Sequence, residues 1–320
     1  MLRSPYRKEW YVGTSIAKGF IGMELGDRIP TITDYADAFS CSRGIVQNSL
    51  NFLEEQRAVT LDKQGKKGTY LSAKDEGQLF RYSGLNHLTA SMPPPVNRHF
   101  AGLATGICNG MSQCPIPFTF AFVQGSENRV QALASGAYDF VVTTQSAAEA
   151  CLEKYPDLEI AFPFENAEYS LPYKLYINKP GKTDIEDGMV IAVDPTSADH
   201  VTISEKICQG KDVVVKEMPL ISGVYAFYTG DIDCIVFRDG LENNSSNLVN
   251  LVLRNKNSIL PIEISEIPIE EANRDLQRPV ALVHRSNYGM VGILGKYLSG
   301  ETVGFIQKQV LSGNMVPQFY

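Results

Sequence analysis

Three consecutive prolines, Pro93 to Pro95, constrain the fold of this chain more than any other short segment. Proline has a fixed φ and no backbone N–H to donate, so such a run is excluded from helix interiors and from central strands. It also stiffens the segment that contains it. Because 320 residues exceed what one ordinary core supports, the run predicts a connection between folding units. We therefore divide the chain into a head at 1–74, a linker at 75–97 and a body at 98–320.

The head and the body differ in charge. The whole chain has a net charge of -7, but residues 1–75 contain eleven Lys and Arg and nine Asp and Glu, a net of +2. The remainder has 18 basic and 27 acidic side chains, a net of -9. A mildly basic head on an acidic body is typical of an effector domain that carries a nucleic-acid reader.

The head is predicted to fold as three helices followed by a β-hairpin. Apolar residues recur at helical spacing in 7–23, 31–39 and 40–56, which predicts three helices. Residues 57–61 and 68–72 alternate in the manner of strands. In the third helix Val46, Leu50 and Leu53 recur on one face. We expect these three side chains to point inward.

The opposite face of the third helix has the composition of a DNA-reading surface. Asn and Gln can pair with adenine and Arg with guanine in the major groove. A serine at the helix start can cap it and donate to a phosphate, and lysines at a hairpin tip can reach a flanking phosphate. The predicted contacts to double-stranded DNA are Ser42, Arg43, Gly44, Gln47, Asn48, Lys66, Lys67 and Thr69. From spacing alone, a merely solvated helix face or a head that binds protein also stays open.

Residues 26–71 resemble the winged helix-turn-helix of the GntR family of bacterial transcription regulators. The positions that carry this resemblance are Gly26, Ile29, Pro30, Ser42, Arg43, Val46, Leu50, Leu53, Gly68 and Thr69. The resemblance implies a homodimer whose two heads read the half-sites of a near-palindrome. Thr33 and Gln47 depart from the family pattern, which usually has basic residues there, and their loss is expected to weaken non-specific DNA affinity.

The body alternates apolar strands with helices. The segments that predict strands are 118–124, 138–144, 171–177, 189–194, 212–218, 233–238 and 279–284, and those that predict helices are 128–136, 146–155 and 198–210. This order is typical of an α/β fold with largely parallel sheets, in which ligands bind at the carboxyl ends of the strands. The strand near residue 285 is expected to return to the first of two lobes. Gly102, Gly106 and Gly110 recur at every fourth position, which favours close helix packing.

Strand-to-helix junctions of the body supply the candidate ligand contacts. Backbone amides at helix N-termini attract anions, and hydroxyl, amide and guanidinium groups that converge there suit a carboxylate or a phosphate ester. The candidates are Gly125, Ser126, Asn128, Thr143, Thr144, Gln145, Thr196, Ser197 and Arg238. The stretch LASGAYDFVVTTQSAAE resembles an element of type II periplasmic-binding-protein folds, which implies a two-lobed domain that senses a small, anionic effector.

Catalytic and cofactor patterns are incomplete in this sequence. NKPGKT lacks the first glycine of a phosphate-binding loop, GLATGICNG is not a dinucleotide fingerprint, and no paired histidines stand at metal spacing. We therefore expect no cofactor, no metal and no enzymatic activity. The alternative is an enzyme that acts on a small anionic substrate in the body, with Ser197, Asp199 and His200 as candidate groups and the head serving localisation.

The head, the proline run with its continuation RHFAGLATG and the body together resemble, over nearly the full length, the YhfZ-type regulators, which join a GntR-like head to a two-lobed, periplasmic-binding-protein-like sensor. The chain's six scattered cysteines suit a reducing cytosol, and no apolar run approaches the ~18 residues of a membrane span. A cytoplasmic location without membrane contact is expected. The sequence thus predicts an α/β protein in which a winged helix-turn-helix (α+β) precedes a two-lobed α/β domain. Our hypothesis is a transcription regulator that responds to a small metabolite.

Overall fold

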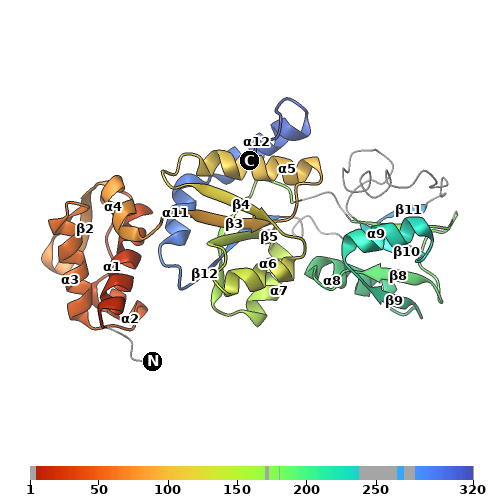
Figure 1. Cartoon of the computed structure of the whole chain (residues 1–320), viewed down its shortest axis with the longest axis horizontal. Coiled ribbons are helices and arrows are strands. Elements are labelled where there is room, and N and C mark those ends of the chain that lie inside the picture. Colours follow the sequence, from red (N-terminus) through yellow and green to blue (C-terminus); the bar gives the residue numbers. More distant parts are fainter. Residues whose placement is uncertain (1–4, 170–172, 180, 238–264, 270–277, 320) are drawn as a thin grey trace.

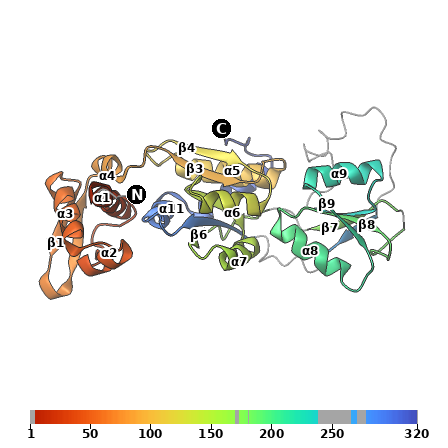
Figure 2. The same ribbon diagram turned by 60° about the horizontal axis from the view of Figure 1, so that its bottom comes forward.

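The computed structural model describes residues 5–169, 173–179, 181–237, 265–269 and 278–319. It divides into a helical head, a first α/β lobe and a second α/β lobe, which lie in a row (Figure 1). Figure 2 shows the same order from another direction. The predicted fold class is therefore confirmed, since a helix-turn-helix head precedes a two-lobed α/β domain.

The head consists of three helices, a hairpin and a further helix within the described residues. Their bounds are Pro5–Ile21 (α1), Ile32–Ala38 (α2), Arg43–Glu55 (α3), Val59–Lys63 (β1), Gly65–Lys67 (η1), Thr69–Lys74 (β2) and Glu76–Ser83 (α4). Helix α2 begins at a capping box, because Thr31 Oγ1 accepts from the Asp34 amide and the Asp34 carboxylate accepts from the Thr31 amide. Ser42 Oγ accepts from the Ile45 amide at 3.4 Å and so caps α3, as predicted.

Apolar faces of the helices form the core of the head. Val46, Leu50 and Leu53 of α3 are buried, which confirms that this face points inward. They belong to one apolar cluster with Ile16 and Phe20 of α1. Full burial of one such side chain contributes about 1.5–3 kcal/mol. Packing therefore holds the exposed face of α3 in a fixed orientation.

The first lobe is a five-stranded sheet with helices on both faces. Its elements are Leu88–Met92 (β3), Arg98–Met111 (α5), Phe118–Phe122 (β4), Ser126–Ala134 (α6), Phe140–Thr144 (β5), Gln145–Lys154 (α7), Leu158–Pro163 (β6), Pro279–His284 (β12), Met290–Tyr297 (α11) and Gly300–Leu311 (α12). The strand order is β4-β3-β5-β12-β6. Helix α5 lies on one face of this sheet, and α6 and α7 lie on the other (Figure 1). Phe140 and Val142 belong to the apolar cluster that contains α5 residues, whereas Val141 belongs to the cluster of α6 and α7. The predicted return of β12 to this lobe is confirmed.

The second lobe is a smaller five-stranded sheet between two helices. Its elements are Lys174–Ile177 (β7), Val190–Val193 (β8), Ala198–Cys208 (α8), Val214–Glu217 (β9), Leu220–Thr229 (α9), Cys234–Phe237 (β10) and Ser265–Pro268 (β11). The strand order is β11-β7-β10-β8-β9, with α8 and α9 on opposite faces. In the part of the chain that the structure describes, no helix combines the length and apolar character of a membrane span.

Both sheets are mixed, which corrects the prediction of largely parallel sheets. In the first lobe β3 is parallel to β4 and β5, but β12 is antiparallel to β5 and β6. In the second lobe β8 is parallel to β9 and β10, but β7 is antiparallel to β10 and β11. Strand β12 arrives from the second lobe at the edge where β5 ends, with Pro279 opposite Thr144. It therefore runs antiparallel to β5.

The segment predicted as a linker, 75–97, contains two elements of the fold. Helix α4 packs against α1 of the head, and β3 is a central strand of the first lobe. The prolines follow β3 and precede α5, so they lie within the first lobe and outside any helix or strand. The head and the first lobe meet at 84–87, where Gly84 ends α4 with a φ of 69°. The proline run is therefore a connection inside a lobe, because the strand before it is paired on both sides.

Three glycines allow close packing on α5, as predicted. A Cβ at Gly106 would lie 2.9 Å from the Val303 carbonyl oxygen of α12, and one at Gly110 would lie 2.7 Å from the Tyr297 carbonyl oxygen. A Cβ at Gly102 would lie 3.2 Å from the carbonyl oxygen of Gln307. Helix α12 therefore rests directly on the backbone of α5.

The head packs directly on the first lobe. A Cβ on Gly22, which follows α1, would lie 2.5 Å from the Cα of Gly292 in α11. Tyr288 lies in the chain between β12 and α11. The centroid of its ring is 4.9 Å from that of Phe39, which follows α2, and 6.3 Å from that of Tyr35 in α2. The two parts therefore share one apolar cluster.

A polar chain runs beside this apolar contact. Lys18 Nζ of α1 donates to Asn287 Oδ1 at 3.1 Å, and Asn287 Nδ2 donates to Asp139 Oδ1 at 3.2 Å. Burial lowers the pKa of Lys18, and the charge of Asp139 opposes this shift. Because both apolar and polar groups pair across the contact, it fixes the orientation of the head.

We predict that Gly22→Ala loosens the head from the first lobe, since the new Cβ has to displace the backbone of Gly292. Overpacking of this kind costs about 1–3 kcal/mol. Gly13→Ala in α1 is the matched control, because its Cβ would lie 3.8 Å from Ser49 Oγ and alanine is favoured in a helix by about 0.5–1 kcal/mol. Thermal unfolding and cleavage at 84–87 by a non-specific protease measure the effect. Unchanged melting and protease resistance in Gly22→Ala contradict this packing.

Candidate functional site

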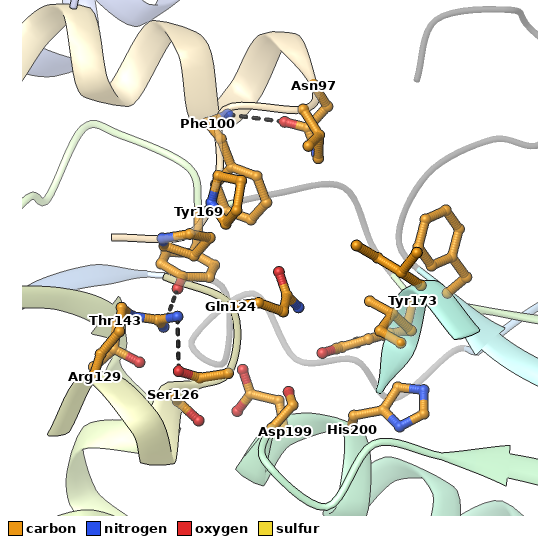
Figure 3. A pocket seen from close by; sticks show the side chains of 18 of the residues that line it. Asn97, Phe100, Gln124, Ser126, Arg129, Thr143, Tyr169, Tyr173, Asp199 and His200 are labelled. Carbon is orange, nitrogen blue, oxygen red and sulfur yellow. Dashed lines mark hydrogen bonds between the residues drawn. The ribbon is translucent and has the colours of Figure 1, made fainter. Parts of the chain in front are cut away.

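A cavity of about 100 Å³ lies between the two lobes. The first lobe contributes the proline run, the start of α5 and the turn before α6, and the second lobe contributes the starts of α8 and α9 and the end of β10 (Figure 3). The lining residues are Pro93, Pro94, Val96, Asn97, Phe100, Gln124, Gly125, Ser126, Arg129, Thr143, Tyr169, Tyr173, Ser197, Asp199, His200, Leu220, Ile221, Val236 and Phe237. The cavity therefore lies where the lobes meet, as expected for a two-lobed binding domain.

Four of the nine predicted ligand contacts line this cavity: Gly125, Ser126, Thr143 and Ser197. Gly125 has a φ of 84°, and a Cβ there would lie 2.3 Å from Thr196 Oγ1 of the second lobe. Both its backbone conformation and the approach of the other lobe require glycine.

Four other predicted contacts do not line the cavity and hold the structure around it. Asn128 Nδ2 donates to the Gln124 carbonyl, and Gln145 Nε2 donates to Glu149 Oε1. Thr196 Oγ1 donates to Asp194 Oδ1, and Thr144 Oγ1 donates to Asp199 Oδ2. The ninth, Arg238, lies outside the described residues.

The helix N-termini on the two sides of the cavity bind one another. The Ala198 amide of α8 donates to Ser126 Oγ at 3.2 Å, and the Glu127 amide of α6 donates to the Thr196 carbonyl at 3.1 Å. The sequence suggested that amides near Ser126 hold an anion. In this structure the Glu127 amide is instead occupied by the second lobe.

Asp199 connects the lobes at the same place. Its carboxylate accepts from Thr144 Oγ1 at 2.8 Å and from Ser146 Oγ at 2.7 Å. Both donors lie at the N-terminus of α7, where the helix dipole favours a negative charge. Asp199 therefore combines two charge-assisted hydrogen bonds with a favourable helix end.

Arg129 is one of several polar residues of the cavity that were not among the predicted contacts. Its side chain is 2% exposed. Nη1 donates to the carbonyls of Val123 and Gly125 at 2.9 and 3.0 Å, and Nη2 donates to Tyr169 Oη at 3.0 Å. Nε is buried and has no hydrogen-bond partner among the described residues. The available sequence signal was its place one helical turn after Gly125, on the side of α6 that faces the strand end.

The catalytic alternative requires a free base, and His200 is engaged at both ring nitrogens. Nδ1 accepts from the Asp194 amide at 3.0 Å, and Nε2 lies 2.8 Å from the Val236 carbonyl oxygen. Burial raises the pKa of the nearby Cys151 thiol to about 11, with a further contribution from Glu127. Among the described residues no group of three His, Cys, Asp or Glu side chains is arranged to hold a metal ion. His200 is therefore held at both ring nitrogens by the backbone of the second lobe.

The second candidate site is the exposed face of α3 with its wing. Ser42, Arg43, Gly44 and Asn48 are exposed, and Gln47 is half-buried. Gln47 Nε2 donates to Asn51 Oδ1 at 2.8 Å, an i, i+4 pair on the helix surface. The predicted surface is therefore present as one continuous helix face.

The wing is the hairpin of β1 and β2. Lys66 and Lys67 are exposed at its tip in η1, whereas Thr69 is half-buried at the start of β2 and its carbonyl accepts from the Ile29 amide. Arg28, which was not among the predicted contacts, is exposed beside Gly68, where a Cβ would lie 2.4 Å from Arg28 Nε. Three basic side chains therefore gather at the wing.

Comparisons with known proteins agree with this architecture. Residues 75–319 match the family model described as YhfZ C-terminal domain, and residues 24–71 match a helix-turn-helix domain model. The chain is 26% identical over 321 residues to "Uncharacterized protein YhfZ" of Escherichia coli (strain K12), covering 100% of both. Among solved structures it is similar to YhfZ from Shigella flexneri, with a TM-score of 0.58, 23% identity, and coverage of 75% of this chain and 96% of that one.

A more distant similarity is to the periplasmic aliphatic sulphonate binding protein SsuA from Escherichia coli, with a TM-score of 0.48, 11% identity, and coverage of 72% of this chain and 75% of that one. The helix-turn-helix match, together with the exposed face of α3, supports a DNA-binding regulator. The YhfZ C-terminal domain model spans the two lobes and most of the chain. In this chain a helix-turn-helix domain precedes the YhfZ C-terminal domain. The chain therefore belongs to the YhfZ family.

Proposed function

We propose that this protein is a cytoplasmic transcription regulator whose head binds DNA and whose two lobes bind a small anionic metabolite. The observation that carries the proposal is Arg129. This buried guanidinium lines the cavity between the lobes, and its described hydrogen-bond partners are all uncharged. A buried cation is costly unless a negative charge compensates it. A bound anion would supply that charge.

In this proposal α3 enters the major groove and the wing contacts the flanking backbone. Arg43, Gln47 and Asn48 face the base edges, where Arg pairs with guanine and Gln and Asn pair with adenine. Lys66 and Lys67, with Arg28, contact phosphates. A homodimer places two such heads on the half-sites of a near-palindromic operator.

The coupling between cavity and head follows strand β12. Thr143, the residue before the last of strand β5, lines the cavity, and β12 pairs with β5 along its length. Beyond β12, Tyr288 contacts Phe39 of the head. A ligand that binds two arrangements of the lobes with different affinity would therefore also shift the position of the head.

We predict that Lys66→Ala combined with Lys67→Ala weakens DNA binding uniformly across sequences. Each lost phosphate contact lowers the slope of log affinity against log salt by about 0.9. The control combines Lys206→Ala with Lys308→Ala, which removes the same charge from exposed positions in the two lobes. Gel-shift titration against the DNA upstream of its own gene, at several salt concentrations, measures both variants. Equal salt slopes in both double variants contradict the assignment of the wing.

A second prediction concerns the contact between the lobes. Asp199→Asn removes the charge from two hydrogen bonds, each worth about 1.5–3 kcal/mol when one partner is charged. The lobes are expected to separate more readily, which raises the radius of gyration in small-angle scattering and lowers the melting temperature. Glu205→Gln, an exposed position of the same helix, is the control. A variant at position 199 that scatters like the wild type shows that Asp199 does not hold the lobes.

The proposal as a whole is tested by native mass spectrometry of the purified protein, followed by DNA binding with the recovered molecule. A co-purified anion that changes DNA affinity supports it. By linkage, DNA must then change the affinity for that anion by the same factor. A protein that shows no sequence preference at any salt concentration, with or without the recovered molecule, excludes the regulatory function.

A further inference from the structure

We infer that the effector is a small carboxylate with an apolar body, bound with its carboxylate group at Arg129. The inference rests on the proposed sensing function and narrows its ligand from anions in general to one chemical class. It follows from the charges of the cavity wall, from the partners of its polar groups and from its apolar surface.

The charges of the wall leave Arg129 as the group that requires an anion. The other charged side chain that lines the cavity, Asp199, accepts from two hydroxyls at the N-terminus of α7 and so has favourable surroundings already. No carboxylate of the described residues forms an ion pair with Arg129. A planar carboxylate matches the geometry of a guanidinium.

Several polar groups of the wall are already engaged within the protein. Asn97 Oδ1 accepts from the Phe100 amide, and Ser126 Oγ accepts from the Ala198 amide. Both nitrogens of His200 are also engaged. The amide of Gln124 is different, because it extends into the space between the lobes (Figure 3). The hydroxyls of Thr143 and Ser197 also line the cavity. A sugar phosphate or other polyol carries more hydroxyls than these two groups and Gln124 can pair, at a cost of about 1–3 kcal/mol for each unpaired group.

Apolar side chains line the cavity on both sides. The proline run and α5 cover the cavity from the first lobe, and α9 and β10 face it from the second. The side chains that form this surface are Pro94, Val96, Phe100, Ile221, Val236 and Phe237. Ile221 is 42% exposed, so an apolar group between the lobes would cover it. Burial of apolar surface therefore favours a ligand with a hydrocarbon body.

The size of the cavity limits this body. A cavity of roughly 150 Å³ holds benzene, and the cavity between the lobes has about 100 Å³. A branched aliphatic chain or a single ring would therefore fill this volume, and the remainder of the ligand would extend beyond the cavity and replace solvent there.

Calorimetric titration of the complete protein with four probes tests the inference. Benzoate and 3-methylbutanoate carry both the charge and the apolar body, benzamide carries the ring without the charge, and inorganic phosphate carries the charge without the body. We expect both carboxylates to bind at least about tenfold more tightly than benzamide and phosphate. Equal binding of benzamide and benzoate, preference for phosphate, or no carboxylate binding at millimolar concentration overturns the inference.

Variants assign the two ends of the ligand. Arg129→Gln is expected to lower benzoate affinity at least about tenfold, with Arg129→Lys, which keeps the charge, in between. Ile221→Ser, at a surface position that leaves the core intact, is expected to lower it about fivefold, whereas Tyr225→Ser, one turn along α9 and 40% exposed, leaves it unchanged. If Ile221→Ser binds benzoate like the wild type, the apolar body does not lie between the lobes.

Failure of this inference can be distinguished from failure of the proposed function. If a carboxylate binds but DNA affinity does not change, the inferred ligand class is supported and the proposed sensing function is contradicted. Sequence-specific DNA binding that responds to a recovered anion of another class, such as a phosphate ester, keeps the regulatory function and overturns the carboxylate.

Discussion

Strand β12 is the element on which the arrangement of the whole molecule depends. It returns from the second lobe and pairs between β5 and β6 of the first, so that residues far apart in the sequence complete one sheet. Its first residue, Pro279, lies opposite Thr144, next to Thr143, which lines the cavity. The residues that follow it place Tyr288 and Gly292 against the head. One strand thus connects the cavity, the first sheet and the contact with the DNA-reading domain.

The contact between the lobes is polar, and this has a consequence for ligand binding. Two backbone amides, one backbone carbonyl, three hydroxyls and the Asp199 carboxylate are paired where the helix N-termini meet. Such hydrogen bonds are directional, so they hold the lobes in register. The apolar residues of the cavity lie beside this contact and gain from a ligand that covers them. The polar contact therefore orients the lobes, and in the proposed function the apolar wall would supply the driving force for ligand binding.

Sequence patterns were reliable where a few neighbouring residues decide the outcome. The inward face of α3, its cap at Ser42 and the close packing at Gly106 were each predicted from spacing or residue type, and the structure has them. The proline run was also excluded from helices and strands correctly. Its place in the molecule was misjudged, because that place depends on β3, which pairs with β4 and β5 from later in the chain.

The sequence by itself determined the helix-turn-helix head, the α/β character of the body and the strand ends that supply polar groups. Periodicity and capping are local properties, and a single sequence displays them. Only the tertiary structure decided which of those polar groups line the cavity and which hold it together. Thr144 pairs with a carboxylate 55 residues later, and Arg129 is buried because Tyr169, 40 residues later, covers it. Both contacts form only when segments that are far apart in the sequence have packed together, so no pattern along the chain displays them.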